Sequence, residues 1–326
     1  MPVTHSEFFL IDNYFKSKSI NRSDVFLGIG DDAAVTTVPT GTQLVSAVDT
    51  MVSGVHFSED TPPYCVGYKS LAVNLSDLAA MGAEPAWATL AITMPQADEA
   101  WIQHFCDGFF NLAKSHSVQL IGGDTTQGPL TITVQIMGLV PDGQALTRRG
   151  AQVGDLIYVS GTLGDAAAAL TLVRNDQQVG ASTIDKALRS RLDRPTPRVE
   201  LGLQLRKIAS SAIDISDGLA SDLSHVLEAG GVGATIRQES IPLSSSLDAI
   251  EDTEQVMQWA LQGGDDYELC FTVSPENCSS VETIARQLKL NVTEIGFVEE
   301  KKGLRLSNEA VVQELSPIGF EHFSKP

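Results

Sequence analysis

The chain has 326 residues, of which 43% are hydrophobic and 19% are charged, so it is long enough for two domains with buried cores. Lysine and arginine number 22 against 41 aspartates and glutamates, which gives a formal charge of −19 at pH 7. This charge argues against nucleic acid as a partner. A nucleotide could approach only if divalent cations lay between its phosphates and the carboxylates.

The sequence predicts neither a secretion signal nor a membrane span. Its first ten residues lack a basic stretch followed by an apolar run, and nowhere do about 18 apolar residues occur in succession. The four cysteines form no C-x-x-C pair, which argues against a zinc site and a disulfide framework. We therefore expect a cytoplasmic protein with reduced thiols and no membrane partner.

The first half of the chain alternates predicted helices and strands. Helices are predicted over residues 6–15, 71–78 and 98–115, and strands over 43–48, 88–94 and 130–136. The run 43–48 is largely apolar, so we expect a buried strand that delivers Asp49 at its C-terminal end. Asn74 and Asp77 share a polar face of the second helix, opposite its leucines.

Turn residues between 141 and 154 mark a boundary near residue 145. In the second half, strands are predicted over 155–160 and 267–273, and helices over 164–174, 198–208 and 217–229. The sequence thus predicts an α/β or α+β protein with an N-terminal domain over 1–145 and a C-terminal domain over 146–326.

Acidic turns recur beside these strands. They occupy residues 28–32, 48–49, 122–124, 214–218 and 263–268. A single Gly-Asp turn is usually structural, because glycine accepts a positive φ and aspartate bonds its own backbone. Several carboxylates at strand ends repel one another unless cations or ligand groups neutralise them, and magnesium takes carboxylate, water and phosphate oxygens together. Their recurrence therefore predicts a magnesium-nucleotide site.

The familiar signatures of calcium and ATP sites do not occur in this sequence. It contains no EF-hand loop, no G-x-x-x-x-G-K-[ST] loop, and no pair of H-R-D and D-F-G motifs. Phosphoryl transfer by this chain would therefore require another fold.

Six strings resemble the thiamine-monophosphate kinase family, in that family's order. They span residues 28–34, 49–57, 74–85, 122–126, 215–219 and 263–269. The family belongs to the aminoimidazole-ribonucleotide-synthetase-like superfamily, whose members are dimers of two-domain α/β subunits. The resemblance implies that an N-terminal ATP- and magnesium-binding domain is completed by the C-terminal domain. It also implies direct phosphorylation of thiamine monophosphate to thiamine diphosphate, with ATP as co-substrate.

The resemblance also implies residue roles. Magnesium ligands would be Asp32, Asp49, Asp77, Asp124, Asp214 and Asp217. ATP would contact Gly123, Asp124, Arg148 and Ser216, with Asp214, Asp217 and Arg148 acting on the transferred group. His56, Asp265 and Phe320 match substrate-contacting positions of the family. The carboxylate of Asp265 suits the cationic thiazolium of the substrate, and the ring of Phe320 could stack on a flat ring.

Two positions depart from the family pattern. Ala47 and Val48 stand where hydroxyl residues usually precede the aspartate equivalent to Asp49, which removes one side-chain ligand. Cys106 stands at a position that is usually aromatic, which removes an adenine-stacking contact.

Two alternatives remain from the sequence. One is another ATP-using enzyme of the superfamily, although selenophosphate synthetase would carry a reactive cysteine near its N-terminus and the first cysteine here is Cys65. The other is a non-catalytic module that binds magnesium-nucleotide or thiamine phosphate. The complete aspartate set favours an enzyme, because phosphoryl transfer requires the metals.

Overall fold

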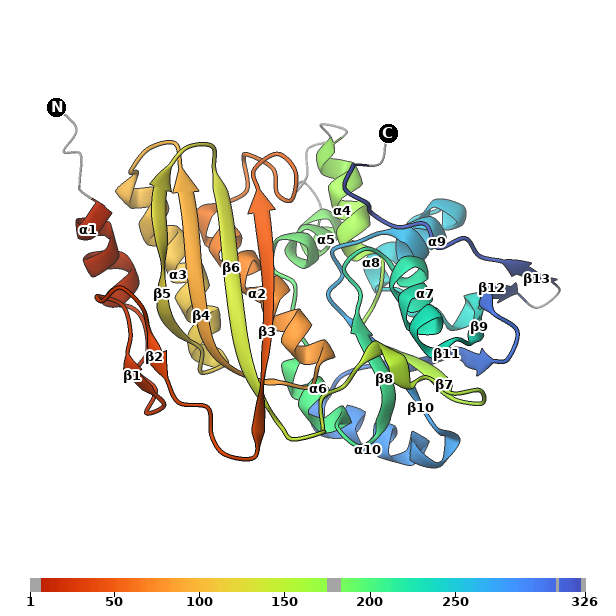
Figure 1. Ribbon diagram of the computed structural model, residues 1–326. Helices are drawn as coiled ribbons and strands as arrows, with labels where there is room; N and C mark the ends of the chain where they lie inside the picture. Colours follow the sequence, from red (N-terminus) through yellow and green to blue (C-terminus); the bar gives the residue numbers. More distant parts are fainter. Residues whose placement is uncertain (1–6, 175–182, 309–310, 324–326) are drawn as a thin grey trace. The chain divides into compact units, whose positions relative to one another are not determined.

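The computed structural model describes residues 7–174, 183–308 and 311–323 (Figure 1). The chain divides into two compact units, one of residues 1–78 and 83–143 and the other of residues 79–82 and 144–326.

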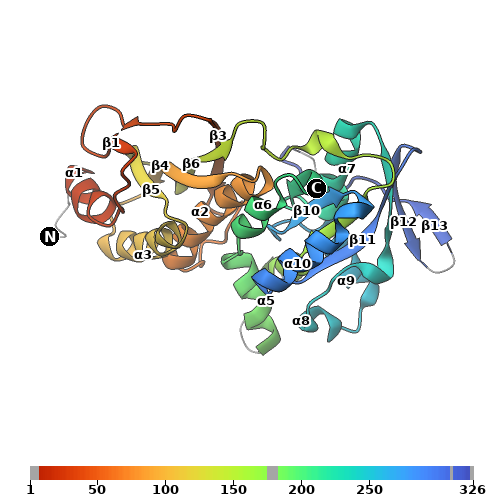
Figure 2. The ribbon, with the colours of Figure 1, turned by 90° about the horizontal axis from the view of Figure 1, so that it is seen from below.

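The first unit is built on a four-stranded sheet with the order β3-β6-β4-β5. Its elements are α1 (Glu7–Leu10), the π-helix η1 (Ile11–Lys16), β1 (Val25–Leu27), β2 (Val35–Thr36), β3 (Thr42–Val52), α2 (Pro63–Ala80), β4 (Glu84–Met94), α3 (Glu99–Ser115), β5 (Gln119–Gln127) and β6 (Thr131–Pro141). Helices α2 and α3 cover one face of this sheet (Figures 1 and 2). The short β1-β2 pair contributes Val25 to a small cluster around the buried Trp87.

Helix α3 forms as its sequence predicts. Asp98 caps it by accepting the Trp101 N–H at 3.1 Å, and Phe105 and Phe109 of the apolar stripe are completely buried. In α2 the leucines are also buried, but Asn74 is completely buried with them, so the predicted polar face is not a solvent face.

The strand predicted over 43–48 is present, but the prediction that it is buried is wrong. β3 runs from Thr42 to Val52 at the edge of the sheet, and Val48 is 60% exposed. Asp49 therefore lies within the strand and not at its end. An edge strand has a neighbour on one side only, which an apolar run alone does not reveal.

The second unit contains a seven-stranded sheet with the order β13-β12-β9-β11-β7-β10-β8. Its strands are β7 (Leu156–Ser160), β8 (Ala209–Asp214), β9 (Gly233–Arg237), β10 (Leu269–Val273), β11 (Val292–Glu299), β12 (Gly303–Asn308) and β13 (Val311–Glu314). Its helices are α4 (Asp165–Arg174), α5 (Thr183–Asp193), α6 (Val199–Leu205), α7 (Leu219–Gly230), α8 (Ser245–Asp248), α9 (Thr253–Gln262) and α10 (Cys278–Leu288), with 3-10 turns η2 (Arg148–Gly150), η3 (Gln238–Ser240) and η4 (Pro275–Asn277). All strand pairs are antiparallel except β12 with β9.

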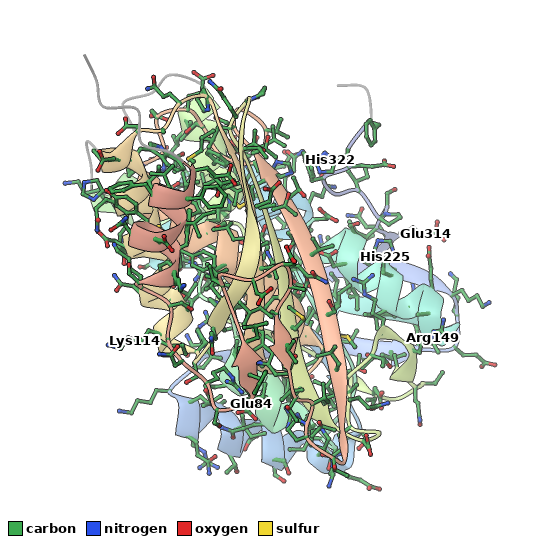
Figure 3. All side chains as sticks on the ribbon, turned by 60° about the vertical axis from the view of Figure 1, so that its left-hand side comes forward. Glu84, Lys114, Arg149, His225, Glu314 and His322 are labelled. Carbon is green, nitrogen blue, oxygen red and sulfur yellow. The ribbon has the colours of Figure 1, made fainter. Side chains whose placement is uncertain are left out.

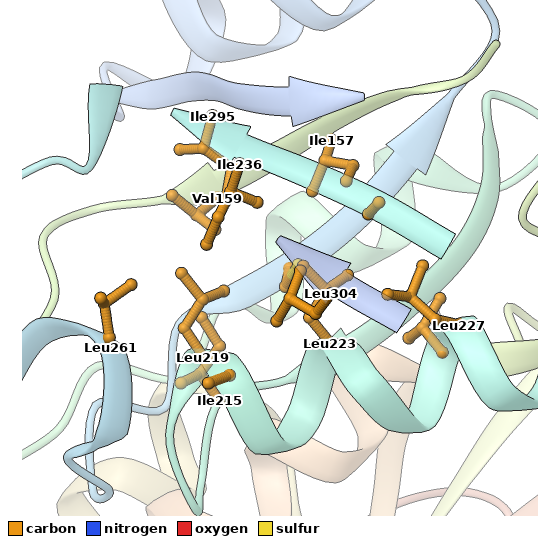
Figure 4. Packing of buried hydrophobic residues seen from close by; sticks show 14 of the residues in the cluster. Ile157, Val159, Ile215, Leu219, Leu223, Leu227, Ile236, Leu261, Ile295 and Leu304 are labelled. Carbon is orange, nitrogen blue, oxygen red and sulfur yellow. The ribbon is translucent and has the colours of Figure 1, made fainter. Parts of the chain in front are cut away.

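Helix α7 packs on this sheet through one apolar face (Figure 4). Leu219, Leu223 and Leu227 of the helix lie in one cluster with Ile157 and Ile236 of the strands, and all are buried. This packing fixes the start of α7, where the acidic loop 214–218 enters the helix.

Candidate active site

Two acidic loops of the second unit are joined by backbone hydrogen bonds. The Asp265 N–H donates to the Ser216 carbonyl at 2.9 Å, and the Tyr267 N–H donates to the Ile215 carbonyl at 2.8 Å. Gly264 is required there, because a Cβ on it would lie 2.4 Å from the Ser216 carbonyl oxygen. The loops 214–218 and 263–268, which are far apart in sequence, are thus joined.

The C-terminal segment contacts the loop 214–218. The Phe320 N–H donates to the Asp217 carbonyl at 3.0 Å, and a Cβ on Gly319 would lie 2.5 Å from that oxygen. The predicted metal ligand Asp217 and the predicted substrate contacts Asp265 and Phe320 therefore belong to three adjoining segments of one unit.

Asp214 ends strand β8, opposite Leu269 of β10, and is buried. Asp217, three residues on, is half-buried. Burial raises the pKa of Asp217 above its usual value, while the nearby charges of His225, His322 and Arg148 oppose that rise (His225 and His322 are labelled in Figure 3). Arg148 is exposed in η2, so its guanidinium is available to an anion near Asp217.

Asp222 is a site residue that the sequence analysis missed. Its Oδ2 accepts the backbone N–H groups of Ser216, Asp217 and Gly218 at 3.0 to 3.1 Å, and the side chain is buried. Burial raises the pKa of Asp222 to about 7, and the charge of Asp214 contributes to the rise. Because the chain's own carboxylate fills this group of N–H donors, a bound nucleotide would meet the side chains of the loop and not these amides.

Two buried acids hold the segment that carries Asp265. Asp266 accepts the Gly164 N–H on both oxygens, at 2.9 and 3.1 Å, and burial raises its pKa well above the usual range. Glu268 is completely buried and binds Arg191 and Arg198. Between and beside these anchors, Asp265 and Tyr267 adopt φ values of 69° and 50°. Such conformations persist at non-glycine residues only where surrounding contacts impose them.

Register places two predicted ligands of the first unit on opposite faces of its sheet. Asp49 pairs with Val134, which pairs with Leu90, and both apolar residues are buried on the helix-covered face. Asp124 aligns with Ala91 and, through it, Thr133 on the opposite face. Paired residues point to the same side of a sheet, so Asp49 and Asp124 point to different sides.

The remaining acids of the first unit lie in a loop and a helix. Asp32 follows Asp31, whose Oδ1 accepts the Asp32 N–H at 2.9 Å, and both are exposed. Asp77 is half-buried near the end of α2. Asn74, one turn earlier, donates from Nδ2 to the Ser70 carbonyl at 3.0 Å, whereas its buried Oδ1 accepts no hydrogen bond from the described part of the chain.

Gly123 and His56 have clear local roles. A Cβ on Gly123 would lie 1.9 Å from the Leu90 carbonyl oxygen, so the close approach of β4 and β5 requires glycine. His56 lies in the turn after β3, where Nδ1 accepts the Val52 N–H at 3.0 Å. The imidazole is therefore held with Nδ1 as an acceptor, which leaves Nε2 to carry the proton of the neutral ring.

Comparison with known proteins assigns the family. Two family models match, AIR synthase related protein, N-terminal domain, over residues 30–140, and AIR synthase related protein, C-terminal domain, over 152–308. The thiamine-monophosphate kinase of Escherichia coli (strain K12) is 47% identical over 321 residues, which cover 98% of this chain and 99% of that protein. The chain belongs to the thiamine-monophosphate kinase family.

Solved structures agree with this assignment. The crystal structure of the thiamine-monophosphate kinase from Stenotrophomonas maltophilia K279a is 48% identical and has a TM-score of 0.87, covering 94% of this chain and 98% of that one. AaThiL complexed with AMPPCP and TMP is 31% identical with a TM-score of 0.79, covering 97% of each chain. The predicted two-domain fold of mixed helices and sheets is thus confirmed.

The residues expected from the thiamine-monophosphate kinase family are divided between the two units. Asp32, Asp49, Asp77 and Asp124 belong to the first unit, and Asp214 and Asp217 to the second. Within the described ranges, no three His, Cys, Asp or Glu side chains lie close enough to hold a metal without other ligands. Across the same ranges, no helix is long and apolar enough to cross a membrane.

Proposed function

We propose that this protein transfers the terminal phosphoryl group of ATP to the phosphate of thiamine monophosphate, giving thiamine diphosphate and ADP. The observation that carries the proposal is identity of 47% along nearly the whole chain to a thiamine-monophosphate kinase. The related AaThiL complex with AMPPCP and TMP supports the pairing of an ATP analogue with the thiamine substrate. The cytoplasmic location expected from the sequence remains part of this proposal.

Magnesium fits the acidic residues proposed to hold it. They supply only carboxylate oxygens, the ligand type that this hard cation prefers. In the second unit, burial and the neighbouring carboxylates Asp214 and Asp217 raise the pKa of Asp222, so the loop carries repulsion that a cation would offset. The proposed ligands are Asp32, Asp49, Asp77, Asp124, Asp214 and Asp217. Because Asp49 and Asp124 point to different sides of the sheet, these two would hold different ions. When bound, several magnesium ions would neutralise the phosphates and the charge that develops during transfer.

The chain's own residues would bind and orient the two substrates. Arg148 would offer two N–H groups to phosphate oxygens, Ser216 its hydroxyl, and Gly123 a backbone that no side chain shields. Asp265 would attract the thiazolium cation, Phe320 would stack on a ring, and His56 would donate from Nε2. The acceptor is already an anionic phosphate oxygen, so direct in-line transfer requires no covalent enzyme intermediate and no strong general base.

We also propose that the protein is a homodimer. Helices α2 and α3 leave one sheet face of the first unit uncovered (Figure 2). Leu44 and Val48 point to that face, because the residues that alternate with them in β3 pair with buried residues of β6, and they are 49% and 60% exposed. A second copy packed on this face would bury both side chains. Light scattering on the purified protein would test this, and a monomer at micromolar concentration would contradict it.

The activity is tested by incubating the purified protein with ATP, magnesium and thiamine monophosphate and separating the products by chromatography. We expect thiamine diphosphate and ADP in equal amounts, and none of either when EDTA is added. Free thiamine is the control acceptor and should yield no phosphate ester. A protein that binds both substrates without forming the diphosphate would be a binding module, and the proposal would fail.

A further inference from the structure

Asp222 binds the backbone of the loop that carries the proposed metal ligands Asp214 and Asp217. The carboxylate lies in the first turn of α7 and is 97% buried, since its relative exposure is 3%. A single oxygen, Oδ2, accepts the N–H groups of Ser216, Asp217 and Gly218 at 3.1, 3.0 and 3.1 Å. Three consecutive peptide units are thereby fixed in orientation.

The carbonyl side of the same peptides makes the rest of the site. With their N–H groups turned toward Asp222, the carbonyls of Ser216 and Asp217 accept from Asp265 and Phe320. Loss of the carboxylate would release three donors at once, and the orientation of both carbonyls would loosen with them. One buried side chain thus holds together segments proposed for metal, ATP and thiamine phosphate.

Helix capping alone does not account for this arrangement. The residue before α7 is Gly218, which has no side chain to cap the helix, and the three amides that bond Asp222 all precede its first residue, Leu219. An ordinary cap, however, lies before the helix and bonds amides inside it, as Asp252 does for Gln255 at the start of α9. Asp222 lies inside the helix and bonds amides of the preceding loop.

We propose that Asp222 is a positioning residue for phosphoryl transfer, which holds the 214–218 loop so that Asp214 and Asp217 present their carboxylates to the metal. This inference rests on the proposed function. Residues that orient metal ligands typically change metal affinity by about 10- to 100-fold when they are removed. The same range is expected here.

The test compares Asp222→Ala, Asp222→Asn and the matched control Asp252→Ala, which removes a helix-start carboxylate of the same unit away from the loop. Two readouts are measured for each folded variant: Mn²⁺ binding by electron paramagnetic resonance, and the magnesium concentration that gives half the maximal rate. Asp222→Ala should weaken Mn²⁺ binding at least about tenfold and raise the magnesium requirement similarly. Asp222→Asn keeps an oxygen acceptor and should lose less, while Asp252→Ala should lower the melting temperature and leave both metal readouts unchanged.

Several outcomes would overturn the inference. It fails if Asp222→Ala binds Mn²⁺ like the wild type, or if Asp252→Ala shifts metal binding equally. If Asp222→Ala does not fold, Asp222→Asn is used instead. The inference fails if the magnesium requirement of Asp222→Asn is as high as that of Asp214→Asn, because an oxygen acceptor at residue 222 would then not hold the loop. A wild-type protein that binds Mn²⁺ but does not phosphorylate thiamine monophosphate would refute the proposed function, and the Mn²⁺ comparison would then test only whether Asp222 positions the metal ligands.

Discussion

Substitution of Glu268 by glutamine tests the network that holds the Asp265 segment. Glu268 is completely buried, and its carboxylate binds Arg198 through Nε and Nη2 at 2.5 Å each, Arg191 Nη2 at 2.7 Å and Ser160 Oγ at 2.6 Å. The amide would remove the counter-charge that both guanidinium groups share in a largely desolvated place, and Arg191 would keep only the more distant Asp165, whose Oδ2 lies 3.8 Å from its Nε. Removing one partner of such a buried pair costs about 3–5 kcal/mol.

The pair of Arg237 and Glu294 provides the control. This pair belongs to the same unit, and its distance of 2.6 Å between Nη2 and Oε1 is similar to the distances that Glu268 makes with its arginines. The two side chains, however, are 31% and 37% exposed. Exposed pairs contribute about 0–1 kcal/mol, so Glu294→Gln should change the free energy of unfolding by no more than that. Urea unfolding followed by circular dichroism measures both variants. A loss below about 1 kcal/mol in Glu268→Gln would refute the reasoning, because it would mean that the buried charges need no compensation.

Three further predictions concern other parts of the chain. Gly123→Ala should lower the free energy of unfolding by about 1–3 kcal/mol in thermal melts, because its Cβ would lie 1.9 Å from the Leu90 carbonyl oxygen; an unchanged melting temperature would contradict this. Asp265→Asn should raise the KM for thiamine monophosphate and leave ATP binding by calorimetry unchanged, and the reverse pattern would remove its substrate role. The hydrogen bond from Arg22 lowers the pKa of Asp24 below its usual 3.8. The stabilising contribution of the Asp24 carboxylate is therefore complete above that pH and disappears as the pH falls through the lowered value. The stabilities of wild type and Asp24→Asn in acid unfolding should converge at low pH, and a constant difference would contradict the assignment.

Periodicity predicted the elements whose burial follows one simple rule. Phe105 and Phe109 of α3 and the apolar run of β10 are buried, because helix and strand periods decide which side chains meet the core. In β4, Leu90, Ile92 and Met94 are buried but Ala91 is exposed, so that run is not buried throughout. The shorter extent of α6, which ends at Leu205, follows from Arg206, whose ψ of 133° lies outside the helical region, and the left-handed Lys207, with a φ of 65°, follows it. No sequence pattern distinguishes Arg206 from its helical neighbours.

The edge position of a strand and the register of its pairing could not be predicted from the sequence. The run 43–48 is apolar yet half-exposed in β3, because only the pairing order tells that this strand has one neighbour. Likewise, each acidic motif could be located, but the face on which Asp49 or Asp124 lies depends on pairing through two other strands.

The anchoring acids were missed for a related reason. Asp222, Asp266 and Glu268 have the same residue types as the proposed ligands and lie within or beside the same motifs. What separates them is burial and hydrogen bonding: Asp222 binds loop amides, Asp266 binds Gly164 N–H, and Glu268 binds two arginines. One signal was present, since Asp222 follows Asp217 by five residues and lies in the predicted helix 217–229, where a buried acid needs a partner.

The most direct test is the rate of thiamine diphosphate formation as magnesium is varied, for wild type, Asp214→Asn and the exposed control Asp248→Asn. If carboxylate-held magnesium carries the transfer from ATP, the rate of the wild type and the control rises from zero with magnesium. Asp214→Asn should be slower by at least about a hundredfold while remaining folded. Equal rates for wild type and Asp214→Asn, or diphosphate formed without any divalent cation, would contradict it.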